Sequence, residues 1–293
     1  MYCASTQDSV TRFQTARGLR ATGVCDEATW AALVEAGWTL GDRHLKLTSP
    51  HMRGDDVSTL QAELCRLGFD AGRVDGIFGT RTAGALLEFQ RSCGMPGDGM
   101  CGPETLRFLD RLGRQSGTGP GVSALRETER IRSLSRFVEC RIVVGQFGGL
   151  SSLARELARA ARHLGAEVLL VDEPDARAQA DAANRFQAHG YLGLEASFEA
   201  DSSFFYYQVP AFASPAGRGL AEQLAMTVGP LLEQPPTVEG IRLPVLRETR
   251  MPAVLCRLGP VRAIVDDAPR LAGACAAAMH AWVEATPPTS SIT

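Results

Sequence analysis

The stretch that decides the fold of the first third of the chain is residues 57–109, which read VSTLQAELCRLGFDAGRVDGIFGTRTAGALLEFQRSCGMPGDGMCGPETLRFL. Its opening part carries leucines at helical spacing, at positions Leu60, Leu64 and Leu67. Gly68 follows at the point where a helix needs a C-cap residue. The pattern therefore predicts a helix that ends at this glycine.

Two turns divide the rest of this stretch. Asp75-Gly76 predicts the first turn, and Thr80 is then the expected N-cap of a second helix. Asp98-Gly99 predicts another turn, after which Pro103 favours the first position of a short helix. Residues 57–109 are thus expected to form a three-helix unit.

Residues 6–33, TQDSVTRFQTARGLRATGVCDEATWAAL, repeat the later part of this pattern. The matched positions are Phe13 with Phe89, Gln14 with Gln90, Gly23 with Gly99, Thr29 with Thr105 and Leu33 with Leu109. Such internal duplication indicates one supersecondary unit that is used twice. The first copy lacks the opening helix of the second, so we expect either that Met1 is a late start or that the sequence has been trimmed.

The full pattern, DG-x-FG…T…FQ…G…DG…G-x-x-T, resembles the peptidoglycan-binding domain of bacterial wall hydrolases. The resemblance implies a small all-α repeat that binds peptidoglycan fragments or precursors. Its candidate ligand-binding residues are Asp75, Phe78, Thr82, Phe89 and Gln90. In the alternative interpretation Phe78, Phe89 and Gln90 are mainly architectural, because most positions of the motif are core and turn positions.

Composition favours a globular chain. The formal net charge over 293 residues is −3, which gives no indication of a nucleic-acid partner. No run approaches the roughly 18 apolar residues of a membrane span. The eight cysteines show no C-x-x-C motif and no metal-like spacing with the five histidines, which favours a reducing compartment. We therefore expect a cytoplasmic protein, with export as the alternative if a signal lies upstream of Met1.

The chain divides by composition into a partial repeat, a complete repeat, a linker with a helical segment, a second domain and a polar tail. These parts are expected at residues 1–40, 41–112, 113–136, 137–285 and 286–293. The tail has no means of packing and is expected to be disordered. It carries three candidate phosphorylation sites, Thr286, Thr289 and Thr293.

The second domain alternates strand and helix patterns with short connections. Strands are expected at residues 141–144, 167–171, 191–196, 204–209 and 254–258, and helices at residues 151–164, 176–189, 216–232 and 268–285. This alternation predicts an α/β fold around a largely parallel sheet, preceded by the two small all-α repeats.

The series resembles the zinc-dependent N-acetylmuramoyl-L-alanine amidase domain, the amidase_3 family, over about residues 140–285. The strand that leads into Gly148-Gly149 and the stretch MPAVL at residues 251–255 carry the match. The resemblance implies a zinc-held water, two histidine ligands, a glutamate ligand on a loop and a catalytic glutamate. At these places the chain has Phe147 and Glu195 for the histidines, no loop after Gly149, and Arg257 for the catalytic glutamate.

These vestigial positions leave no working zinc site. Phe147 cannot ligate a metal, and Arg257 would repel Zn²⁺ and stays protonated. Glu195 and Arg257 are expected either to pair with each other or to reach solvent at a cleft edge. The domain is therefore predicted to be a pseudoenzyme, with no catalytic residues and no cofactor.

Wall-binding repeats ahead of such a domain resemble the CwlM-type proteins, and residues 38–43, 54–62, 74–79 and 101–107 carry this resemblance. It implies a cytoplasmic, non-catalytic regulator of peptidoglycan synthesis that is switched by threonine phosphorylation. The implied partners are a MurA-type enolpyruvyl transferase and forkhead-associated or flippase proteins. Two alternatives stay open: a zinc-dependent amidase that hydrolyses peptidoglycan, and an exported wall-anchoring module.

Overall fold

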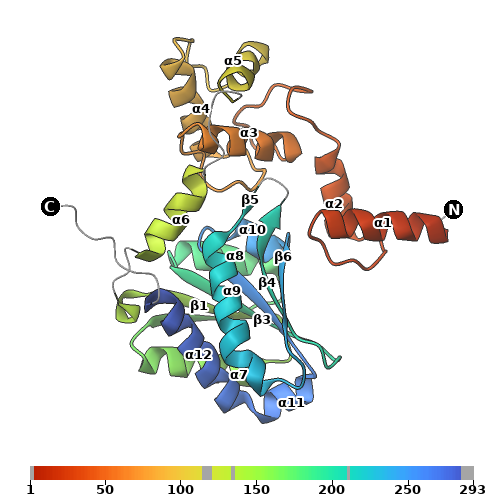
Figure 1. The fold of residues 1–293 in the computed structure, drawn as a ribbon, viewed down its shortest axis with the longest axis vertical. Helices are drawn as coiled ribbons and strands as arrows, with labels where there is room; N and C mark the ends of the chain where they lie inside the picture. The colour runs from red at the N-terminus through yellow and green to blue at the C-terminus, as the bar shows by residue number, and fades with distance from the viewer. Residues whose placement is uncertain (1–2, 114–120, 133–135, 210–211, 285–293) are drawn as a thin grey trace. The chain divides into compact units, whose positions relative to one another are not determined.

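The computed structural model describes residues 3–113, 121–132, 136–209 and 212–284. These residues form two compact units (Figure 1). One lies within residues 3–126 and includes Phe212, and the other lies within residues 127–284. Among the described residues, no helix combines the length and hydrophobicity that a membrane-spanning helix needs.

The first unit is all-α. Its helices are α1 (Ala4–Ala16), α2 (Glu27–Ala36), α3 (Asp55–Arg66), α4 (Thr80–Ser92) and α5 (Pro103–Gly113), and α6 (Val122–Arg132) begins in it. Helices α3, α4 and α5 form the predicted three-helix repeat around a core that includes Leu60, Leu64, Phe78 and Phe89. The first repeat consists of α1 and α2 alone within the described residues, so the prediction of a complete and an incomplete all-α repeat is confirmed.

The turn residues behave largely as predicted. Gly68 has φ +95° and follows the C-cap of α3, so the predicted end of this helix is correct. The predicted N-cap of α4 is wrong by one position, because Gly79 is the N-cap and Thr80 is the first helical residue. The carbonyl of Gly79 accepts the hydrogen bond of the Ala83 N–H (3.0 Å), which places the start of the helix at the glycine.

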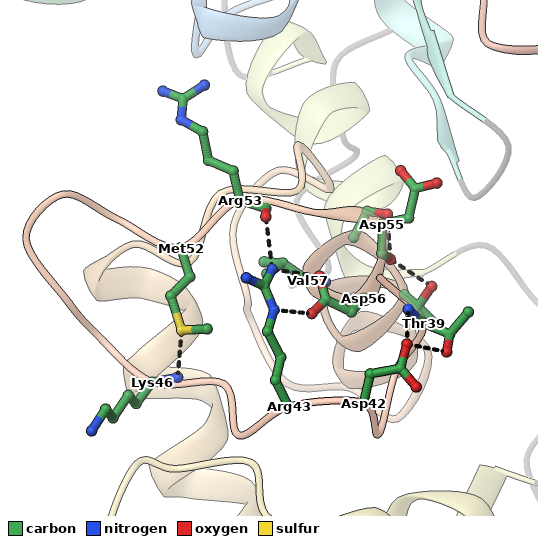
Figure 2. Close-up of polar contacts among 11 residues, drawn as sticks. Thr39, Asp42, Arg43, Lys46, Met52, Arg53, Asp55, Asp56 and Val57 are labelled. Carbon is green, nitrogen blue, oxygen red and sulfur yellow. Dashed lines mark hydrogen bonds and ion pairs between the residues drawn. The ribbon is translucent and has the colours of Figure 1, made fainter. Parts of the chain in front are cut away.

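A bidentate ion pair anchors the segment before α3 onto that helix (Figure 2). Arg43 Nε donates to Asp56 Oδ2 (2.6 Å), and Arg43 Nη2 lies 3.1 Å from Asp56 Oδ1 and donates to the carbonyl of Arg53 (2.7 Å). The side chain of Asp56 is fully buried. The guanidinium of Arg43 also lies 4.4 Å from the ring centroid of Trp38. The motifs at residues 38–43 and 54–62 are therefore two halves of one cluster.

Gly54 is part of the same cluster because of the space it leaves. A Cβ atom at this position would clash with the carboxylate of Asp56 and the guanidinium of Arg43. The absence of a side chain at Gly54 thus lets the ion pair close at the N-terminus of α3.

We predict that Asp56→Asn lowers the free energy of unfolding of the helical unit by about 3 kcal/mol, because it leaves Arg43 without its buried counter-charge. Asp42→Asn is the matched control, since Asp42 is exposed and caps only Thr39, and its cost should stay below about 1 kcal/mol. Urea denaturation of the full chain measures both variants. Equal losses would contradict the anchoring role of the ion pair.

The second unit is built on a mixed sheet in the order β2-β1-β3-β7-β4-β5, with β6 paired to β4. The β4–β7 pair is antiparallel, while the pairs β1–β2, β1–β3, β3–β7 and β4–β6 are parallel. The strands are β1 (Arg141–Gln146), β2 (Glu167–Asp172), β3 (Gly190–Ala196), β4 (Ser203–Val209), β5 (Phe212–Ala213), β6 (Thr237–Ile241) and β7 (Ala253–Leu258). The predicted α/β fold with a largely parallel sheet is confirmed.

Helices cover both faces of this sheet (Figure 1). Helices α7 (Ser151–His163), α9 (Pro215–Val228) and α12 (Ala268–Glu284) pack together on one face, over a core that includes Ile142, Leu192 and Val254. Helices α8 (Ala176–Arg185) and α10 (Pro244–Glu248) pack together on the other face. The remaining short helices are η1 (Phe137–Glu139), η2 (Gly229–Leu231) and α11 (Val261–Asp266).

The structure differs from the predicted elements at several places. Helix α8 ends at Arg185 rather than at residue 189, because the chain turns at Gln187 with φ +53° before β3 begins. Strand β6 and the short helices α10 and α11 were not predicted. Their segments are too short for a hydrophobic period to stand out, since α10 has 5 residues and α11 has 6.

Candidate functional site

A buried glutamine holds the second half of the complete repeat. Gln90 Nε2 lies within hydrogen-bond distance of Asp98 Oδ1 (2.7 Å), the Met100 carbonyl (3.0 Å) and Thr105 Oγ1 (3.2 Å). Gln90 Oε1 accepts the N–H of Gly99 (2.9 Å). One amide thus ties the end of α4 to the turn and to the start of α5. Hydrogen bonds from the Met100 N–H and from Gln90 lower the pKa of Asp98 below its ordinary value.

The same arrangement, which we call the glutamine clamp, occurs twice more. Gln61 Nε2 contacts Asp75 Oδ1 (2.9 Å), the Ile77 carbonyl (3.0 Å) and Thr82 Oγ1 (3.1 Å), while Gln61 Oε1 accepts the Gly76 N–H (2.8 Å). The clamp therefore joins α3 to α4 as well as α4 to α5.

In the first repeat, Gln14 forms the third clamp. Gln14 Nε2 contacts Thr22 Oγ1 (3.2 Å), the Val24 carbonyl (2.9 Å) and Thr29 Oγ1 (2.9 Å), and Gln14 Oε1 accepts the Gly23 N–H (2.8 Å). In all three clamps the glycine precedes the threonine by six positions, as 23 to 29, 76 to 82 and 99 to 105. This spacing was the sequence signal for the Gln61 clamp, which the repeat alignment missed.

The predicted ligand-binding residues lie inside this framework. Phe78 and Phe89 are fully buried, and Thr82 and Gln90 are at most 2% exposed. Phe78 and Phe89 therefore contribute to the core, and Thr82 and Gln90 contribute internal hydrogen bonds. These roles agree with the architectural interpretation of Phe78, Phe89 and Gln90. Asp75 alone among the five is half-buried, and its carboxylate accepts from Gln61 and from the Ile77 N–H (2.8 Å). Ligand binding by these residues stays a prediction.

In the α/β unit, the three vestigial positions meet at the carboxyl edge of the parallel strands. Glu195 on β3 lies directly beside Arg257 on β7. Arg257 Nε donates to Glu195 Oε2 at 3.4 Å, and both side chains are about a quarter exposed, at 25% and 23%. Of the two alternatives expected for these residues, the structure shows the pair, with both side chains still partly exposed. Phe147 follows β1, and its N–H donates to the carbonyl of Leu194 (3.0 Å), next to Glu195.

Arg257 has a second neighbour besides Glu195. Its guanidinium carbon lies 5.2 Å from the ring centroid of Phe205, which lies on β4. The arginine thus contacts both a carboxylate and an aromatic ring. Such a residue supplies charge and positioning but no proton, because a guanidinium stays protonated.

A hydrogen-bond network fixes the ends of β1 and β2 at the same edge. Gln146 Nε2 donates to Ser151 Oγ (3.2 Å) and to Asp172, and Gln146 Oε1 accepts the Gly148 N–H (2.8 Å). Gln179 Nε2 donates to the Gln146 carbonyl (3.0 Å). Sequence reasoning missed these residues; a buried glutamine at the end of an apolar strand was the available signal.

The network continues behind the edge through a tyrosine. The hydroxyl of Tyr191 donates to Gln179 Oε1 (2.6 Å). Burial raises the pKa of Tyr191 far above its ordinary value, so the phenol remains a neutral hydrogen-bond donor. Its contacts are those of a structural residue, since the donor is already engaged.

The donor set at this edge does not fit a catalytic zinc ion. Such a site needs about three protein ligands and an open position. Phe147 offers no donor atom, and the carboxylate of Glu195 is engaged by Arg257. Within residues 3–113, 121–132, 136–209 and 212–284, no group of three or more His, Cys, Asp or Glu side chains converges in a way that could hold a metal.

Comparison with known proteins relates the chain to wall-binding families. The family model described as "Putative peptidoglycan binding domain" matches residues 1–33 and 53–109. The chain is 48% identical over 136 residues to the N-acetylmuramoyl-L-alanine amidase CwlM of Mycobacterium tuberculosis, covering 45% of this chain and 33% of that protein. It is 35% identical over 104 residues to the "Uncharacterized protein in bpoA1 3'region" of Kitasatospora aureofaciens, covering 35% of this chain and 85% of that protein.

The chain belongs to this peptidoglycan-binding family. It has the CwlM-type arrangement, in which peptidoglycan-binding repeats are followed by a second domain. The chain spans about a third of the length of CwlM. Among solved structures, the amidase Ami1 of Mycobacterium smegmatis aligns with a TM-score of 0.44 at 11% identity, covering 50% of this chain and 97% of that one.

For a member of this family, the glutamine clamp should dominate the stability of the repeat. We predict that Gln90→Ala lowers the free energy of unfolding of the helical unit by about 2–4 kcal/mol, since it strands the Gly99 N–H and the Thr105 hydroxyl. Glu88→Ala on the exposed side of α4 is the control and should cost less than about 0.5 kcal/mol. Guanidinium denaturation measures the free energy of unfolding of both variants. If Gln90→Ala lowers it no more than Glu88→Ala does, the glutamine clamp does not stabilise the repeat.

The ion pair at the sheet edge is tested by a double-mutant cycle. We predict a coupling free energy of about 1 kcal/mol between Arg257→Ala and Glu195→Ala, because the pair is only partly desolvated. The exposed pair Arg270–Asp267, at 3.9 Å, serves as the control and should show coupling near zero. Additive losses at Arg257 and Glu195 would show that the two side chains do not interact in solution.

Proposed function

We propose that the chain is a non-catalytic, peptidoglycan-binding regulatory protein of cell-wall biosynthesis. The observation that carries this proposal is the Arg257–Glu195 ion pair at the carboxyl edge of the sheet. Membership of the peptidoglycan-binding family supports peptidoglycan binding and, with it, association with the cell wall. The absence of catalysis and the regulatory role are the proposal.

The chemistry of the edge supports a loss of hydrolysis. Amide hydrolysis by a zinc enzyme needs a metal-held water and a carboxylate that accepts its proton. The amidase_3 resemblance assigns the carboxylate's place to Arg257, which cannot accept a proton. It assigns one metal ligand to Phe147, which has no donor atom. Glu195 retains a carboxylate, and that group is paired with Arg257.

The proposed partners are peptidoglycan fragments or precursors for the repeats, and for the whole chain a MurA-type enolpyruvyl transferase or forkhead-associated and flippase proteins. We propose a cytoplasmic location, which the eight free cysteines support, five of them buried. The candidate phosphorylation sites Thr286, Thr289 and Thr293 lie outside the described residues, so the proposed switch rests on their residue type and position.

The test of this function measures zinc content and hydrolysis on the same preparation. We predict that the purified full chain, incubated with zinc and dialysed, retains far less than one zinc per chain by mass spectrometry. We also predict that it releases no stem peptides from muropeptides, while a zinc-dependent amidase of the amidase_3 family, as the positive control, does so under the same conditions. Stoichiometric zinc together with released stem peptides would establish the amidase alternative instead.

Binding is measured separately, by calorimetric titration of the same protein with muropeptide. Saturable binding without hydrolysis is the result we expect. If the protein neither hydrolyses nor binds muropeptide, peptidoglycan fragments are not among its partners.

A further inference from the structure

An exposed tryptophan belongs to the cluster around Arg43. Trp38 is 37% exposed and lies after α2, in the segment that leads to α3. The guanidinium of Arg43 lies over its ring, 4.4 Å from the ring centroid. Leu40, two residues further along, packs against the core of the complete repeat. The segment that presents Trp38 at the surface is therefore held by the second repeat.

Arg43 and the turn before it fix this segment. Asp56 and the carbonyl of Arg53 hold the guanidinium of Arg43 (Figure 2). In the turn, the N–H and the hydroxyl of Thr39 both donate to Asp42 Oδ2, at 2.8 and 2.6 Å. The N–H of Asp42 donates in return to the carbonyl of Thr39 (3.1 Å). The segment is thus ordered before a ligand arrives, so binding there loses little conformational entropy.

The same turn places a carboxylate close to Trp38. Asp42 is exposed, and its Oδ2 accepts from the N–H of Thr39, the residue that follows Trp38. Its Oδ1 accepts no hydrogen bond from any residue that the structure describes. Hydrogen bonds from the hydroxyl and the N–H of Thr39 lower the pKa of Asp42 below its ordinary value, so the group is a carboxylate at neutral pH. An aromatic ring and a hydrogen-bond acceptor therefore lie near each other at the surface.

We propose that Trp38 and Asp42 form the site at which the helical unit binds the saccharide part of peptidoglycan. This assignment rests on the proposed function, since it requires that the chain binds peptidoglycan. The C–H groups on one face of a pyranose ring pack on an indole, because the face of an aromatic ring is electron-rich. The hydroxyls of the sugar donate hydrogen bonds to a carboxylate, which accepts at both oxygens.

The charges at this site favour the sugar over the stem peptide. The positive charge of Arg43 is balanced by the buried Asp56, while Asp42 adds an exposed negative charge. A stem peptide with free carboxylates is therefore repelled, whereas a neutral N-acetylated sugar is not. Thr82 and Gln90 of the repeat motif offer no competing site, since both are at most 2% exposed and are hydrogen-bonded internally.

The test titrates the full chain with two separate parts of peptidoglycan, peptide-free glycan strands and free stem peptide. We expect saturable binding of glycan by calorimetry, with a change in tryptophan fluorescence, and no binding of stem peptide. Trp38→Ala should weaken the affinity for glycan roughly tenfold, while Trp38→Tyr, which keeps an aromatic face, should retain most of it. Asp42→Asn should weaken it about threefold, because a charged acceptor is lost. Trp30→Ala removes another exposed tryptophan, 63% exposed on α2, and should leave the affinity unchanged.

Circular dichroism confirms that each variant folds. If Trp38→Ala does not fold, Trp38→Leu replaces it, since leucine keeps apolar bulk beside Arg43 without an aromatic face. Glycan binding that survives the loss of the Trp38 ring, or that Trp30→Ala weakens equally, would overturn the site. Binding of stem peptide in place of glycan would overturn the saccharide assignment and leave peptidoglycan binding intact. Binding of neither part would remove peptidoglycan binding from the proposed function, and the site with it.

Discussion

The primary amide of a buried glutamine is the group on which both repeats depend. A primary amide carries two donors and an acceptor on one rigid plane, so it can pair with an N–H and with several oxygens at once. Gln14, Gln61 and Gln90 each use this capacity to hold a turn glycine and the threonine of the next helix. Three short helices bury little apolar surface, so fixed turns contribute much of what makes the arrangement unique.

This constraint explains which residues the repeat pattern contains. The turn glycines Gly23, Gly76 and Gly99 all have φ near +70°, a conformation that favours glycine, and their N–H groups face the amide oxygens. The repeat pattern therefore contains mainly residues that the turn geometry and the internal hydrogen bonds require. It identifies the family through its scaffold.

The sequence predicted the helices of the repeat because leucine spacing and turn glycines act over a few residues. It also predicted the Glu195–Arg257 pair as one of two alternatives, because the amidase_3 resemblance assigns both residues to the same vestigial site, and the structure places them on adjacent parallel strands. It did not explain the motif around Arg43, because the partner Asp56 lies 13 positions away and only the fold joins them. Gln146 at the end of an apolar strand was a signal in the sequence, but its contacts with Gln179 and Tyr191 come from three separate elements that only the fold brings together.

In both units, a glutamine side chain holds a glycine-containing turn by accepting a backbone N–H hydrogen bond. At the carboxyl edge of the sheet, the backbone after β1 must turn away through Gly148 and Gly149, both with positive φ, before α7 begins. Gln146 holds that turn by accepting the Gly148 N–H, as the clamp glutamines hold theirs. Gln179 and Tyr191 then fix the position of Gln146 from behind. The turn that opens α7 is thus held by side-chain amides and a phenol, and the neighbouring strand ends are held by an ion pair.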